Sequence, residues 1–127
     1  MIKEIRVLIV DDNIGLLTTM SLILRHVGYS VMTAKNGQEA IECVKRNNLQ
    51  IIFIDIKMPG KNGVDVYKEL KRIIPKVPVV MMTGYSRDDL VQEGIEAGVH
   101  KVIFKPLDMD FVINLIKEVV TGQVTDI

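Results

Sequence analysis

Short apolar runs alternate with longer amphipathic segments along this sequence, and this alternation is the feature that most narrows the possible folds. The apolar runs are rich in β-branched residues and cover residues 5–10, 30–34, 51–54, 79–83 and 101–104. Their lengths are typical of strands. The segments between and after them have the length of helices and cover residues 14–27, 37–46, 63–74, 87–97 and 108–120. The pattern therefore predicts five strands, each followed by a helix.

The apolar runs also lack the alternation of polar and apolar residues that marks a sheet with one face in water. Strands of this kind are buried on both faces, as in a parallel sheet with helices on each side. The helical segments supply apolar faces, for example Val112, Leu115, Ile116 and Val119 in one segment and Val66, Leu70 and Ile73 in another. The predicted fold class is α/β, a doubly wound five-stranded parallel sheet with five helices. A chain of 127 residues is sufficient for one such domain, expected to span residues 1–127.

The charge balance disfavours partners that bind through electrostatics. Lys and Arg together number 16, as do Asp and Glu, so the formal net charge is zero. This predicts neither a nucleic-acid-binding surface nor attraction to a membrane. No apolar run approaches the length that spans a bilayer, the N-terminus does not resemble a signal peptide, and the single Cys43 cannot form an internal disulfide. We therefore expect a cytoplasmic protein.

Polar residues follow four of the predicted strands, where the site of a doubly wound sheet is expected. They are Asp11 and Asp12 after the first strand, Asp55 after the third, Thr83 at the end of the fourth and Lys105 after the fifth. Three adjacent carboxylates repel one another unless a cation lies among them. Mg²⁺ prefers oxygen ligands and is often shared with a phosphate, so it suits this set better than zinc. The Lys and Thr side chains would supply donors for a phosphoryl group.

Four short motifs occur in order at these strand ends. They are "VDDN" at 10–13, "DIKMPGKNG" at 55–63, "MMTGY" at 81–85 and "FKP" at 104–106. Through these motifs the chain resembles, over essentially its whole length, the receiver domain of two-component response regulators, including single-domain chemotaxis regulators. The resemblance implies the strand order 2-1-3-4-5, which periodicity alone does not provide.

The resemblance also implies a function in phosphoryl transfer. Asp55 would take the phosphoryl group from a phosphohistidine of a sensor histidine kinase or phosphotransfer protein. Lys105 would pair with the phosphoryl oxygens, Thr83 would hydrogen-bond one of them, and a cis bond before Pro106 would orient Lys105. Such a domain catalyses only its own phosphorylation and dephosphorylation, and it relays the signal to a downstream effector by a conformational change.

The cofactor implied by the resemblance is Mg²⁺. Asp12 and Asp55 would bind it directly, Asp11 would act largely through water, and the backbone carbonyl of Lys57 would complete the protein ligands. The Pro and Gly residues of "MPGKNG" are expected to shape the loop that brings this carbonyl to the metal.

Several residues near the site modify what the resemblance implies for signalling. Val102 occupies a position where the family usually carries an aromatic ring, and Phe104 is not expected to substitute for that ring. Lys57 and Tyr85 are bulky residues at positions that resemble a gate over the phosphoryl group. Gly94 lies inside the predicted helix 87–97 and is expected to weaken it.

Three alternative functions remain open at this point. A flavodoxin-like electron carrier would need a phosphate-binding, Gly-rich loop where this chain has "DDNIG". A phosphatase of the haloacid dehalogenase type would need Asp-x-Asp, whereas Asp11 and Asp12 are adjacent. A receiver-like interaction module that is never phosphorylated is disfavoured by the intact set of acids, Thr and Lys.

Overall fold

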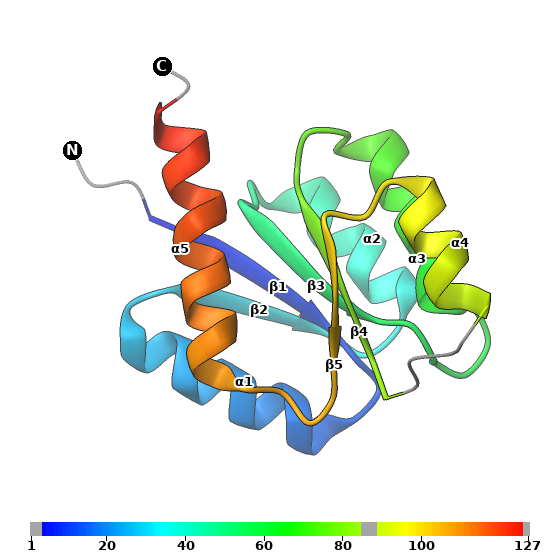
Figure 1. Ribbon diagram of the computed structural model, residues 1–127, viewed down its shortest axis with the longest axis horizontal. Helices are drawn as coiled ribbons and strands as arrows, with labels where there is room; N and C mark the ends of the chain where they lie inside the picture. Colours follow the sequence, from blue (N-terminus) through cyan, green and yellow to red (C-terminus); the bar gives the residue numbers. More distant parts are fainter. Residues whose placement is uncertain (1–3, 85–88, 126–127) are drawn as a thin grey trace.

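The computed structural model describes residues 4–84 and 89–125, which form a three-layer structure with a central sheet (Figure 1). The strands are β1 (Arg6–Val10), β2 (Ser30–Ala34), β3 (Ile51–Asp55), β4 (Val79–Thr83) and β5 (Lys101–Phe104). The helices are α1 (Ile14–Val27), α2 (Gly37–Arg46), α3 (Gly63–Ile73), α4 (Asp89–Ala97) and α5 (Met109–Thr125).

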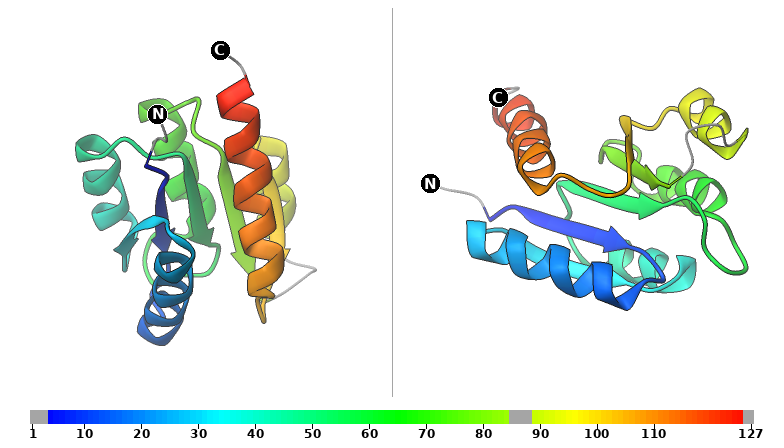
Figure 2. Two further views of the ribbon diagram at one scale, coloured as in Figure 1. Left: turned by 90° about the vertical axis from the view of Figure 1, so that its left-hand side faces the viewer. Right: turned by 60° about the horizontal axis from the view of Figure 1, so that its bottom comes forward.

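The sheet is entirely parallel and has the order β2-β1-β3-β4-β5. The predicted fold class is therefore confirmed, and so is the strand order implied by the resemblance. Helices α1 and α5 cover one face of the sheet, and α2, α3 and α4 cover the other (Figure 2). Each connection between strands contains one helix, as parallel strands require.

Burial is most complete in the three inner strands. Residues 7–10 of β1 and every residue of β3 and β4 are buried. Alternate side chains point to opposite faces, so that one apolar cluster packs under α2, α3 and α4, and a second packs under α1 and α5. This explains the absence of polar alternation in the sequence of these strands.

Helix boundaries agree with the sequence prediction to within a few residues. Asn side chains at positions 13, 36 and 62 accept hydrogen bonds from backbone N–H groups in the first turns of α1, α2 and α3. Helix α5 continues beyond residue 120 to Thr125. The predicted apolar stripe of α3 is wrong at its end, because Ile73 lies in the last turn of the helix, where it is exposed to solvent. The predicted start of the fourth helix at residue 87 lies outside the described residues.

Candidate functional site

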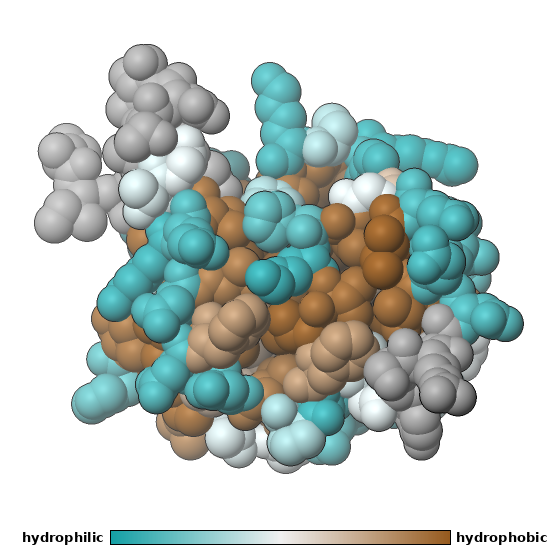
Figure 3. All heavy atoms as spheres, in the orientation of Figure 1, coloured by the Kyte–Doolittle hydropathy of each residue, from teal (hydrophilic) through white to brown (hydrophobic). Residues whose placement is uncertain are grey.

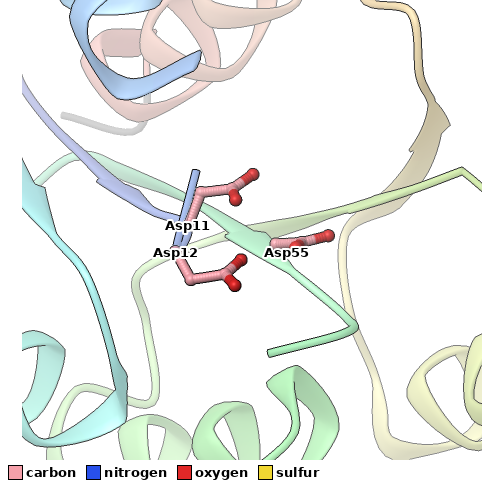
Figure 4. A group of neighbouring side chains, drawn as sticks. All are labelled: Asp11, Asp12 and Asp55. Carbon is pink, nitrogen blue, oxygen red and sulfur yellow. The ribbon is translucent and has the colours of Figure 1, made fainter. Parts of the chain in front are cut away.

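Three carboxylates meet at the rim formed by the carboxyl ends of the strands. Asp11 and Asp12 directly follow β1, and Asp55 is the last residue of β3, which pairs with β1. Figure 4 shows the three side chains directed toward a common space. A carboxylate oxygen from each lies within 4.8 Å of the other two. The predicted acidic cluster is thus present, and adjacent parallel strands create it.

Lys105 brings a positive charge to this cluster from the far end of the sequence. Its Nζ atom lies 2.8 Å from Oδ2 of Asp11 and 3.4 Å from Oδ1 of Asp55. The Lys105 backbone N–H donates to the Thr83 carbonyl (2.8 Å), and the following peptide bond, to Pro106, is cis, as the resemblance implied. The ammonium group therefore bridges two of the three carboxylates.

The three Asp residues have different environments. Asp11 is 1 % exposed, and its two oxygens are both engaged, since Oδ1 accepts the Asn13 N–H (2.9 Å) and Oδ2 accepts Lys105. Asp55 is 7 % exposed. Asp12 is exposed and, among the residues that the structure describes, has no hydrogen bond or ion pair. A ligand arriving from solvent would therefore meet Asp12 and Asp55 first.

The crowding of charge changes the acidity of two groups. Burial, followed by the negative charge of Asp11, raises the pKa of Asp55 to about 6, although the Lys105 ammonium opposes this change. Burial on its own would lower the pKa of Lys105. The hydrogen bond to Asp11 and the charges of Asp55 and Asp11 outweigh that effect, so the pKa of Lys105 is raised. Lys105 is therefore a cation, and it opposes the effects of burial and of Asp11 on Asp55 only in part.

The remaining predicted site residues lie on the same rim. Thr83 is buried and ends β4, where it pairs with Phe104 of β5. Lys57 is exposed and lies two residues after Asp55, in the loop between β3 and α3. Tyr85 lies outside the described residues. Every predicted site residue that falls within the described part of the chain thus lies on the rim or in the loop next to it.

The loop between β3 and α3 is closed by a direct contact between its ends. The Gly63 N–H donates to the Ile56 carbonyl at 2.7 Å. A Cβ atom on Gly63 would lie 2.2 Å from the Asp55 carbonyl oxygen, so only glycine allows the start of α3 to approach the strand so closely. The loop carrying Lys57 is consequently short and anchored next to Asp55.

Sequence reasoning did not identify Asn13 as part of the site. Its side chain begins α1, and its backbone N–H orients the buried Asp11. The spacing Asp-x-Asn after an apolar strand is typical of such a turn and could have indicated this contact.

Comparison with known families places these features in context. Residues 7–117 match the family described as response regulator receiver domain. The chain is 36 % identical over 108 residues to the transcriptional regulatory protein ZraR of Klebsiella oxytoca, covering 85 % of this chain and 24 % of ZraR. It thus spans about a quarter of the length of that relative. It is also 31 % identical over 113 residues to sporulation initiation phosphotransferase F of Bacillus subtilis, covering 89 % of this chain and 91 % of the relative.

Solved structures show the same architecture. A receiver domain protein described as CheY-like, from Methanospirillum hungatei, superposes with a TM-score of 0.92 at 27 % identity and covers 98 % of this chain and 99 % of its own. The response regulator TrrA of Thermotoga maritima, solved in complex with Mg²⁺ and BeF, superposes with a TM-score of 0.79 at 28 % identity, covering 91 % of this chain and 98 % of its own. Among the described residues, no helix is long and apolar enough to cross a membrane.

Proposed function

Because this chain belongs to the family of response regulator receiver domains, we propose that it accepts a phosphoryl group on Asp55 in a Mg²⁺-dependent reaction. The observation that carries the proposal is the setting of Asp55. It is a nearly buried carboxylate, 3.4 Å from the Lys105 ammonium and within 4.8 Å of two further carboxylates. This combination is suited to a nucleophile that must approach a phosphate dianion.

The donor set fits Mg²⁺. All three side chains offer oxygen atoms, and neither Cys43 nor either His residue belongs to the cluster, which disfavours zinc. Because both Asp11 oxygens are engaged, Asp12 and Asp55 are proposed as direct ligands, with Asp11 acting through water. The Lys57 carbonyl is proposed as the remaining protein ligand. Bound Mg²⁺ would neutralise charge on the carboxylates and on the phosphoryl oxygens. TrrA, a relative by structure, was solved with Mg²⁺ and BeF, which supports this assignment.

The proposed step is a transfer between two nucleophiles. An Asp55 carboxylate oxygen attacks phosphorus while the P–N bond of the donor phosphohistidine breaks. The electron pair of that bond stays on the histidine nitrogen, and an acyl phosphate forms on Asp55. The Lys105 ammonium then forms an ion pair with one phosphoryl oxygen, and the Thr83 hydroxyl donates a hydrogen bond to another.

The proposed partners follow from this step. The donor is a sensor histidine kinase or a phosphotransfer protein, and the receiver of the signal is a downstream effector. We propose that residues 1–127 form one receiver domain, which acts as a signalling domain and not as an enzyme with a separate substrate. The zero net charge provides no basis for direct binding of nucleic acid by this domain.

The test is the intact mass of the protein after incubation with acetyl phosphate and Mg²⁺. We expect the wild-type chain to gain the mass of one phosphoryl group and Asp55→Asn to gain none. Asp110→Asn, which removes an exposed acid on α5, is the matched control and should be phosphorylated normally. Phosphorylation of Asp55→Asn at the same level as the wild type would refute the assignment of the acceptor.

The metal is tested in the same assay. Excess chelator, or Asp12→Asn, should prevent phosphorylation, because the nucleophile then faces the phosphate without a compensating cation. Equal phosphorylation with chelator would contradict the Mg²⁺ dependence. If neither acetyl phosphate nor a phosphohistidine donor modified the protein, the alternative of an unphosphorylated interaction module would be preferred.

A further inference from the structure

Helix α4 has no cation in its own last turn, and a lysine of α3 takes that place. The last carbonyl groups of a helix lack partners within the helix and carry a partial negative charge. The Lys71 ammonium donates to one of them, the carbonyl of Ala97, at 2.7 Å. Gly98 then ends the helix in the left-handed conformation, and its N–H donates to the carbonyls of Gly94 and Ile95. Lys71 therefore caps α4 from a neighbouring helix.

The surroundings of Lys71 leave room for this contact. Its Nζ atom lies 5.9 Å from the centre of the ring of Tyr67, a buried residue one turn earlier in α3. A Cβ atom on Gly98 would lie 2.9 Å from Nζ, so the absence of a side chain there leaves space for the ammonium group. Lys68 adds an exposed ion pair with Glu93 of α4 at 3.5 Å. We refer to the contacts of these two lysines with α4 as the α3–α4 clasp.

Both helices of the clasp start next to residues of the phosphorylation site. Helix α3 starts at Gly63, which packs against the backbone of Asp55. Helix α4 follows Thr83 through residues 84–88. The two helices lie side by side on the same face of the sheet (Figure 1). A phosphoryl group that is bound to Asp55 and accepts a hydrogen bond from Thr83 would therefore act near the start of each helix.

The clasp lies where it can oppose a shift of α4 relative to α3. The start of α3 is fixed against Asp55, whereas the buried residues of α4 are only Val91 and Gly94. Movement of Thr83 toward a phosphoryl group on Asp55 would draw on the chain that leads into α4. The Lys71 contact, at the other end of α4, would have to lengthen or break when the helix follows.

We propose that the α3–α4 clasp is an autoinhibitory contact. It favours the position of α4 in the unphosphorylated chain and thereby opposes engagement of the phosphoryl group by Thr83. The inference rests on the proposed phosphorylation of Asp55. Lys71 is a positioning residue, since it acts through α4 and not on the reacting atoms. A contact made in only one of two conformations lowers the affinity of any ligand that requires the other.

The probe is beryllofluoride with Mg²⁺, titrated into the full chain and followed by the amide signals of nuclear magnetic resonance. Lys71→Met removes the ammonium donor and retains an apolar side chain next to Tyr67. We expect this variant to bind beryllofluoride about threefold to tenfold more tightly than the wild type, the range that corresponds to one net hydrogen bond. Lys68→Met should give a smaller change in the same direction, because its ion pair is exposed.

Two further variants separate the clasp from a general effect of charge. Arg72→Met removes the neighbouring exposed cation of α3, which has no hydrogen bond or ion pair among residues 4–84 and 89–125, and should bind like the wild type. Lys71→Arg retains a charged donor and should also bind like the wild type. Without any ligand, hydrogen exchange in the last turn of α4 should be faster in Lys71→Met than in Arg72→Met.

The outcomes distinguish the inference from the proposed function. Tighter binding by Lys71→Met, with Arg72→Met unchanged, supports the autoinhibitory contact. Equal or weaker binding by Lys71→Met overturns it, even if hydrogen exchange in α4 is faster, because the clasp would then hold the helix without opposing the site. Beryllofluoride binding that Asp55→Asn leaves unchanged would instead refute the proposed function, and the inference with it.

Discussion

At the scale of single residues, Asp55 shows how the site works against the stability of the apoprotein. Its carboxylate is nearly buried beside Asp11, and Lys105 compensates only part of the repulsion. The same crowding of negative charge favours binding of a cation. The repulsion that lowers the stability of the folded chain without metal therefore also contributes to the proposed affinity for Mg²⁺.

A pH-dependent stability follows from the pKa of Asp55, which rises from 3.8 to about 6 on folding. Between these two pH values the Asp55 carboxyl is protonated in the folded chain and ionised in the unfolded chain. Raising the pH through this range therefore lowers the free energy of unfolding. Above a pH of about 6, Asp55 is ionised in both states, and its destabilising effect is complete. We expect metal-free Asp55→Asn to unfold with a free energy higher than that of the wild type by on the order of 2 kcal/mol at pH 7.5.

Urea denaturation in the presence of chelator at pH 4.5 and pH 7.5 measures this difference. The gap between Asp55→Asn and the wild type should be much smaller at the lower pH. Asp110→Asn is the control, and a gap that is the same at both pH values would argue against the raised pKa.

The side chain of Lys57 is expected to slow loss of the phosphoryl group. It is exposed two residues after Asp55, where its stem can lie across the rim and obstruct an in-line water. Lys57→Asn should increase the rate of phosphate release from the purified phosphoprotein, and adding Tyr85→Ala should increase it further. Lys61→Asn, in the same loop, is the control, and equal rates in all four proteins would exclude a gate.

At the scale of elements, α4 is held to the molecule differently from the other helices. Its buried residues are Val91 and Gly94. Lys71 of α3 donates to the Ala97 carbonyl at 2.7 Å, at the last residue of α4, and Lys68 of α3 forms an ion pair with Glu93 at 3.5 Å. Contacts with α3 therefore supplement a small buried surface.

Gly94 was expected from the sequence only to weaken its helix, but in the structure it also has a role in packing. A Cβ atom there would lie 2.5 Å from Sδ of the fully buried Met81. Glycine thus lets α4 pack closely against β4, and a larger residue at this position would have to displace the end of the Met81 side chain.

The prediction for α4 is that Gly94→Ala lowers the free energy of unfolding by about 1 kcal/mol or more, because overpacking outweighs the gain in helix propensity. Gly122→Ala in α5 is the matched substitution, since a Cβ there meets nothing within 4 Å. It should stabilise the chain by up to about 1 kcal/mol. The free energies of unfolding of the two variants are measured by urea denaturation. If Gly94→Ala were stabilising, as Gly122→Ala is expected to be, the prediction would be wrong, and the Met81 side chain would move aside without cost.

At the scale of the whole molecule, the rim and one exposed surface share the strands β4 and β5. Thr83 on the rim pairs directly with Phe104, which is 50 % exposed. Figure 3 shows apolar atoms gathered over β5, between α5 and α4, and the exposed apolar residues of these elements are Ile95, Phe104 and Phe111. A change at Thr83 can therefore reach this surface through one pair of strands.

We expect phosphorylation to alter this surface, which is formed by α4, β5 and α5. Beryllofluoride with Mg²⁺ mimics the phosphoryl group, and hydrogen exchange with and without it should differ most over residues 89–104. Residues of α2 serve as the internal reference. Unchanged exchange over 89–104 with a clear change elsewhere would place the output on another face.

Val102 of β5 is half-buried and packs against the apolar cluster under α2, α3 and α4. A small aliphatic side chain therefore occupies the position at which the sequence analysis noted the absence of an aromatic ring.

The positions of the strands and helices, and the membership of the rim, could be read from the sequence. Helical and strand periodicity are local properties, and the carboxyl ends of parallel strands necessarily share one edge of the sheet. The sequence alone therefore predicts that one rim carries all five polar residues, Asp11, Asp12, Asp55, Thr83 and Lys105.

Only the tertiary structure decided how these groups are paired. Asp11 and Lys105 are 94 residues apart, yet they form the shortest ion pair of the site, which leaves Asp12 open to solvent. The close approach of Gly94 to Met81 likewise depends on which strands are neighbours and on their register. Neighbouring strands are joined by long crossover connections, so the distances between such groups result from the packing of the whole sheet and are not encoded in any local pattern.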